Sequence, residues 1–234
     1  MARGTQLSAL VDQLRGEIGA STNVAMGVNT LPNLKQILRR TQAKLWADFD
    51  WPFAWIERDE PIIDGEQYYA FDDEIDFDRI REASLYYGNV WRPLLYGITT
   101  ADYNLSNPEL GMKQDPIQKW SHGEGNQFEV WPVPSSSTTK IRFRAIKKLP
   151  ALVNDNDRAE LDDNLIVLFA AAELLARAKS EDAAAKLRLA QDYYNKLRGN
   201  GMKTTVFTLG GGLPVAREQS LRGAMILPSD RVGN

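Results

Sequence analysis

The sequence contains no cysteine and a single histidine among its 234 residues. The absence of cysteine excludes disulfides, iron–sulfur clusters and thiol catalysis, and it fits assembly in a reducing compartment. The one histidine, His122, has no second histidine to complete a zinc site, and there is no G-x-S-x-G elbow of a serine hydrolase. We therefore expect no enzyme activity, no metal and no cofactor, and we interpret His122 as part of a surface loop.

Long apolar runs and an excess of basic charge are also missing. No run of about 18 apolar residues occurs, and the first residues, MARGTQLSALVDQLRG, lack the apolar stretch of a signal peptide. The 28 basic and 31 acidic residues give a net charge of −3, which lacks the positive field of a dedicated DNA-binding protein. The sequence thus predicts a protein without a membrane segment that is made and folds in a cytoplasm.

Apolar residues recur at helical spacing near both ends of the chain. The segments are 6–20, 30–50, 161–176 and 184–197. The last of them should end at Gly199-Asn200-Gly201, because glycine and asparagine tolerate the left-handed conformation of a helix C-terminus.

Between the helical segments the period changes to that of short strands. Asp64-Gly65 predicts a two-residue hairpin and Gly88-Asn89 a weaker one. The last residues of the segment 128–133 include a proline, which predicts an edge strand. We also expect a short helix over 99–105 and a loop over 111–125. The predicted strands are 56–64, 66–71, 83–87, 90–96, 128–133 and 140–146.

These patterns predict an α+β fold in three parts. Residues 1–50 and 155–200 form a helical bundle, built from the N- and C-terminal helices. Residues 51–154 form an antiparallel β-rich insertion, and residues 201–234 form an extended C-terminal arm.

The arm contains three consecutive glycines, two prolines and short apolar clusters without a regular period. Segments that stay unfolded are usually poorer in apolar residues, so we expect the arm to dock on another subunit or protein. A disordered chain end is the alternative. The predicted anchors are Val206, Phe207, Leu213, Leu221, Met225, Ile226 and Leu227, with Arg217 and Arg222 as charge partners.

The order of several short motifs, given below, resembles that in the head-to-tail adaptor proteins of short-tailed bacteriophages, which are called tail tubular protein A in one branch. A helix with Arg39-Arg40 leads into Asp48-Phe49-Asp50-Trp51-Pro52-Phe53, followed by strands and Trp131-Pro132-Val133-Pro134. Lys147-Lys148-Leu149-Pro150-Ala151-Leu152 and an alanine-rich helix pair come next. The resemblance covers about Leu34 to Leu197.

The resemblance implies a structural virion protein that forms a ring, usually of twelve subunits. Such a ring binds the capsid portal protein, receives the tail tube or nozzle protein, and lets the genomic DNA pass through its channel without reading its sequence. In this setting the acidic run is a candidate for the channel wall, because negative charge would keep DNA from adhering. The run comprises Asp72, Asp73, Glu74, Asp76 and Asp78.

Two other functional classes stay open. Paired carboxylates and exposed aromatic residues could serve a virion-associated cell-wall hydrolase or a glycan-binding protein. However, Trp46, Trp51, Phe53 and Trp55 crowd the junction between helix and strand, where large aromatic residues usually form core. The other alternative is a phage neck or tail-completion protein, which would bind the adaptor where an adaptor binds the portal directly.

Overall fold

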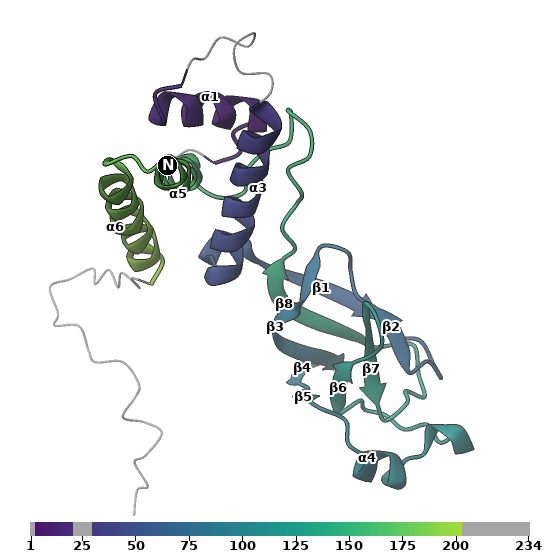
Figure 1. Ribbon diagram of the computed structural model, residues 1–234. Coiled ribbons are helices and arrows are strands. Elements are labelled where there is room, and N and C mark those ends of the chain that lie inside the picture. Colours follow the sequence, from purple (N-terminus) through teal and green to yellow (C-terminus); the bar gives the residue numbers. More distant parts are fainter. Residues whose placement is uncertain (1–2, 21–29, 203–234) are drawn as a thin grey trace, which may run out of the picture.

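The computed structural model describes residues 3–20 and 30–202 of the 234-residue chain. These residues form a helical bundle and two β-sheets, so the predicted α+β class is confirmed. The bundle lies at one end of the molecule and the sheets at the other (Figure 1). The helices are α1 (Leu7–Glu17), α3 (Leu31–Asp48), α4 (Thr100–Leu105), α5 (Asp163–Arg177) and α6 (Ala183–Met202), with short 3-10 turns η1 (Pro52–Ala54) and η2 (Pro108–Leu110).

The bundle combines helices from both ends of the chain, as the apolar periodicity predicts. α5 is its central helix, since α1, α3 and α6 all pack against it. Fully buried leucines of three helices meet in one apolar core, among them Leu10, Leu38 and Leu165. Burial of this shared face is what holds the two ends of the chain together, because a single amphipathic helix is marginal on its own.

The insertion folds into two four-stranded sheets, of order β1-β8-β3-β4 and β2-β7-β6-β5. The sheets pack face to face: the ring centroids of Phe128 and Phe143, from different sheets, lie 4.8 Å apart, and those of Trp120 and Phe143 lie 5.1 Å apart. This gives the sheets an apolar core of their own. The strands are β1 (Trp55–Pro61), β2 (Tyr68–Ala70), β3 (Ile75–Tyr87), β4 (Val90–Pro93), β5 (Leu95–Tyr96), β6 (Lys119–His122), β7 (Gln127–Trp131) and β8 (Lys140–Lys147).

One of the two predicted hairpins is confirmed. Gly88 and Asn89 have φ angles of 58° and 62° and join the antiparallel strands β3 and β4, as a type I′ turn requires. The hairpin predicted at Asp64-Gly65 is wrong. The chain does turn there, but β1 pairs with β8 and β2 with β7, so this turn carries it from one sheet to the other.

Two predictions in the second sheet are also wrong. β6 lies within the predicted loop 111–125, where only Trp120 of its four residues is buried. β7 is a central strand between β2 and β6, not an edge strand. Pro132 follows the last residue of β7, so its missing N–H removes no bond from the ladder.

The segment 90–96 divides between the sheets. β4 pairs with β3 in the first sheet, while β5 pairs with β6 in the second, and that pairing is parallel. The expectation of a purely antiparallel insertion is therefore wrong at this short pair. β3 is also much longer than predicted, because it begins at Ile75 and takes in part of the acidic run.

α6 continues through Gly199 and Gly201 to Met202, beyond the predicted helix end. Glycine costs only about 1 kcal/mol relative to alanine inside a helix, which an established helix can absorb. A glycine-containing tripeptide therefore does not by itself stop a helix whose upstream part is held by packing.

Candidate functional site

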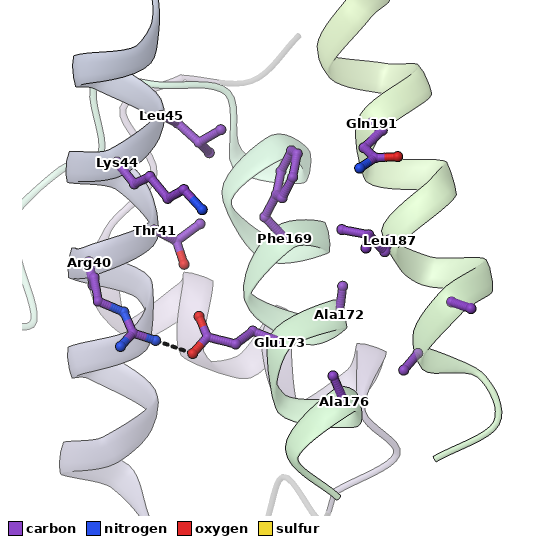
Figure 2. Close-up of a pocket in the computed structure, with 12 residues that line it drawn as sticks. Arg40, Thr41, Lys44, Leu45, Phe169, Ala172, Glu173, Ala176, Leu187 and Gln191 are labelled. Carbon is purple, nitrogen blue, oxygen red and sulfur yellow. Dashed lines mark hydrogen bonds and ion pairs between the residues drawn. The ribbon is translucent and has the colours of Figure 1, made fainter. Parts of the chain in front are cut away.

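The described part of the bundle contains a large apolar groove. It has a volume of about 820 Å³ and lies between α3 and α6, with α5 as its floor (Figure 2). Its apolar lining comes from leucine, phenylalanine and alanine side chains, including Leu45, Phe169 and Leu187. Leu187 is 42% exposed, so an apolar side chain of α6 faces this space without being covered. Such a surface is typical of a site that another chain segment covers.

Charged residues form one rim of the groove. Figure 2 shows Arg40 of α3 reaching across to Glu173 of α5, with which it forms an ion pair. Arg177 also binds Glu173, at 2.6 Å. Burial opposes ionisation of Glu173, but the two guanidiniums outweigh it and hold the pKa of Glu173 below its ordinary value. Lys44 lines the same groove, so the rim carries more positive than negative charge.

Some carboxylates of the acidic run, Asp72 to Asp78, are paired with an arginine. Arg58 of β1 forms an ion pair with Glu74 and lies 3.7 Å from an oxygen of Asp72. Asp73 and Asp78 are exposed, whereas Asp76 is half-buried. The uncompensated negative charge of this surface therefore comes from fewer residues than the sequence suggests.

The Asp48-to-Phe53 motif forms the joint between the bundle and the sheets. Trp51 is buried, and its indole N–H donates to the carbonyl of Leu45 at 3.1 Å. Asp50 accepts hydrogen bonds from Arg79 and Arg81 of β3. Burial raises the pKa of Asp50, but these guanidiniums dominate and the net shift is downward. The motif thus has a structural role, in agreement with the prediction that aromatic residues at this junction form core.

Phe53 fits that interpretation less well than its neighbours. Trp46 and Trp51 are buried, whereas 37% of Phe53 is exposed. The guanidinium of Arg3 lies 3.5 Å from the centre of the Phe53 ring and covers part of it.

His122 lies at the end of β6, not in a surface loop. Its Nε2 is 2.7 Å from the carbonyl oxygen of Phe77, and its Nδ1 is 3.1 Å from the hydroxyl of Tyr96. Both ring nitrogens are therefore engaged in holding neighbouring strands. A cavity of about 580 Å³ lies beside it, lined in part by Trp120 and Glu82. The only sequence signal for this arrangement is the alternation of polar and aromatic residues within Lys119–His122. Four residues are too few for such an alternation to predict a strand.

The tip around α4 is a surface that sequence reasoning missed. Leu105 and Leu110 are largely exposed, and Met112 is about half exposed. Figure 1 places α4 at the end of the sheets farthest from the bundle. Apolar periodicity could not reveal this surface, because the residues belong to a six-residue helix and the turns that follow it.

The predicted arm anchors lie outside the described residues. Val206, Phe207, Leu213, Leu221, Met225, Ile226 and Leu227 and their charge partners Arg217 and Arg222 all fall in 203–234. The structure therefore does not test them.

Within residues 3–20 and 30–202, no three His, Cys, Asp or Glu side chains come together as metal ligands could. None of the helices in the same ranges combines the length and the hydropathy that a membrane span needs.

Comparison with known proteins identifies a family. The family model for the SU10 adaptor protein matches residues 5–215, which is most of the chain. No curated protein matches the chain. The matched range includes the motifs from Leu34 to Leu197 on which the resemblance to phage adaptors was based. The narrower assignment to the tail tubular protein A branch stays a prediction. The chain therefore belongs to the SU10 adaptor protein family of phage adaptors.

Proposed function

We propose that this protein forms a ring of twelve subunits, the number that the adaptor resemblance implies, and that this ring joins the capsid portal to the tail and extends the DNA channel. The observation that carries the proposal is the family match over residues 5–215. Membership of an adaptor family implies a structural role in the virion neck, in contact with portal and tail proteins, and a role other than catalysis. In a closed ring, the same two faces of every subunit must be complementary to each other.

In this proposal the arm, which comprises residues 203–234 beyond the end of α6, docks on the portal protein. The arm follows α6 in the sequence, and its apolar clusters supply the side chains that would be buried on the portal. Burial of each large apolar side chain contributes about 1.5–3 kcal/mol. Simultaneous docking of the arms of one ring would multiply this and give a very long-lived joint.

The test is a truncation after Met202, which keeps α6 whole. The truncated and full-length chains are mixed with purified portal rings and imaged by electron microscopy. Full-length protein should add a ring of density under the portal, and its symmetry gives the subunit number. The truncated chain should stay folded by circular dichroism and add no density. Portal binding by the truncated chain would contradict the role of the arm.

The acidic run is the proposed channel wall. Since Arg58 pairs with Glu74 and lies near Asp72, the exposed carboxylates of Asp73 and Asp78 are the best residues to change. We expect the double substitution Asp73→Lys and Asp78→Lys to slow DNA ejection from assembled particles. Glu181→Lys and Asp182→Lys, two exposed acids before α6, make the matched charge change elsewhere. Equal ejection by the two variants would reject the channel assignment.

The two alternatives have distinct outcomes in simple assays. A neck or tail-completion protein would bind portal–adaptor complexes but not bare portal rings. A cell-wall hydrolase would release fragments from peptidoglycan, and a single Asp or Glu substitution would abolish that turnover. Inertness toward peptidoglycan together with direct portal binding supports the adaptor.

A further inference from the structure

The proposed function assigns no role to the groove between α3 and α6. We infer that in the free protein it is occupied by a segment of the same chain, Leu213–Glu218, before any portal is bound. Leu213 and Arg217 of this segment are also proposed portal contacts, so docking of the arm on the portal would release the segment from the groove.

The first support is the extent of the family match. It continues for 13 residues beyond the end of α6, through Val215, and stops before the apolar cluster at Leu221–Leu227. The arm is thereby divided into a proximal part that shares the family pattern with the bundle and a distal part that lies outside it. A proximal part that packs on the bundle accounts for this division.

The second support is that the chain after Met202 is long enough to reach the groove. The groove is lined by Ala183, Ala184, Leu187 and Gln191, in the first half of α6. At about 1.5 Å per residue, the start of this 20-residue helix lies roughly 30 Å from Met202. An extended chain from Met202 to Leu213 spans up to about 36 Å, so the segment can return along the helix in the same molecule.

The segment has a suitable hinge and suitable chemistry. Three glycines, Gly210 to Gly212, come immediately before it and let the backbone change direction where the segment enters the groove. Its first four residues, Leu213-Pro214-Val215-Ala216, are apolar and match a lining of leucine, phenylalanine and alanine. The groove volume of about 820 Å³ lies in the range of pockets that enclose molecules of drug size, which suits a short peptide segment.

Charge complementarity fixes the direction in which the segment lies. Glu218 is the first acidic residue after Met202. On the rim, Glu173 is bound by Arg40 and Arg177, whereas within the described ranges Lys44 has no carboxylate partner (Figure 2). We assign Lys44 as the partner of Glu218, with the four apolar residues lying over α5.

The absence of natural cysteines allows a direct test by disulfide trapping in the full-length chain. The pair Leu187→Cys and Val215→Cys should form an intramolecular disulfide at least tenfold faster, in dilute solution, than Leu189→Cys and Val215→Cys. Leu189 is the matched control, because it is 51% exposed against 42% for Leu187 but does not line the groove. Equal rates overturn the proposal, and so does a disulfide that forms only between molecules, which would assign the groove to a second copy.

Hydrogen exchange provides a second measurement without cysteines. Amides of Leu213 and of residues 215–218 should exchange at least tenfold more slowly in the wild type than in Ala184→Asp, which places a carboxylate in the groove. Ala185→Asp is the control, since Ala185 is an exposed neighbour outside the lining. Lys44→Glu should also remove the protection, and the exchange Lys44→Glu with Glu218→Lys should restore it. Rapid exchange in the wild type, or equal protection in both aspartate variants, contradicts the docked segment.

Discussion

Arg79 ties the sheets to the end of the helix that leads into them. From β3 its guanidinium donates to the carbonyls of Trp46 and Phe49, at 2.9 and 3.0 Å, and to the carboxylate of Asp50. The last carbonyls of α3 have no partner within the helix, so this side chain caps the helix from another part of the fold. A positive charge at a helix C-terminus is favourable as well.

We expect Arg79→Met to lower the free energy of unfolding by about 2–3 kcal/mol, because it leaves partly buried carbonyls unpaired. Arg81→Met is the matched control. Arg81 also binds Asp50, but its side chain is 62% exposed against 17% for Arg79, so its loss should cost at most about 1 kcal/mol. Urea unfolding measures both, and equal losses would show that Arg79 is no more than a surface ion pair.

Asp59 makes stability depend on pH. The Arg142 guanidinium, followed by the Lys140 ammonium, lowers the pKa of Asp59 to about 2, against 3.8 for the free group. A carboxyl whose pKa is depressed on folding adds stability above its unfolded pKa, and this stability is lost as the pH falls through the folded value. The window is therefore between about pH 4 and pH 2.

At pH 7 we expect Asp59→Asn to reduce the free energy of unfolding by about 1 kcal/mol, less than the full shift implies because the carboxylate is 29% exposed. The difference between wild type and variant should persist to pH 4 and shrink toward pH 2. Asp64→Asn, in the more exposed pair with Lys113, is the control and should change stability by only a few tenths of a kcal/mol. A difference that is constant down to pH 2 would assign the effect of Asp59→Asn to something other than charge.

At the scale of single elements, backbone conformation separates two glycines with similar surroundings. A Cβ added at Gly88 or at Gly16 would meet no atom within 4 Å. Gly88 has a φ of 58° in the β3–β4 turn, whereas Gly16 lies in helix α1. Any difference between alanine substitutions at the two sites therefore reports the backbone and not steric contact.

Gly88→Ala should destabilise the protein by about 1–2 kcal/mol, because a side chain is disfavoured in the left-handed region. Gly16→Ala should stabilise it by up to about 1 kcal/mol, since alanine is the better helix former. Thermal unfolding of the two variants compares them directly. A gain in stability from Gly88→Ala would mean that the hairpin can change its turn type.

At the scale of the whole molecule, the two apolar cores suggest that the bundle and the β-rich insertion are separate domains, a division that stays a proposal. The chain leaves and re-enters the bundle at neighbouring points, because Trp55 of β1 pairs with Ile146 of β8. Paired residues of antiparallel strands have Cα atoms only about 5 Å apart. A short linker can therefore replace the insertion without stretching the bundle.

We expect residues 55–148 to fold alone and to unfold cooperatively in urea. A second variant that joins Ala54 to Leu149 through a short glycine–serine linker should retain the helical circular dichroism of the bundle. Both should be less stable than in the full chain, since each loses the Arg79 contacts and part of the Trp51 junction. Absence of a cooperative transition in both variants would contradict two domains.

The sequence by itself determined the local elements and the family. Apolar periodicity predicts α1, α3, α5 and α6, the Gly88-Asn89 turn follows from residues that tolerate positive φ, and the order of short motifs indicates an adaptor. These features depend on interactions between near neighbours in the chain, so a single sequence is sufficient to read them.

Tertiary structure alone decided which elements pair and which surfaces stay uncovered. The sheet crossing at Asp64-Gly65, the central position of β7, the short strand at Lys119–His122 and the cap supplied by Arg79 all join residues far apart in sequence. The groove between α3 and α6 arises in the same way, because side chains of three helices line it and no one helix shows in its own pattern that its partners leave a gap. Pairing and packing are set by the total surface that can be buried at once, and that quantity belongs to the whole chain.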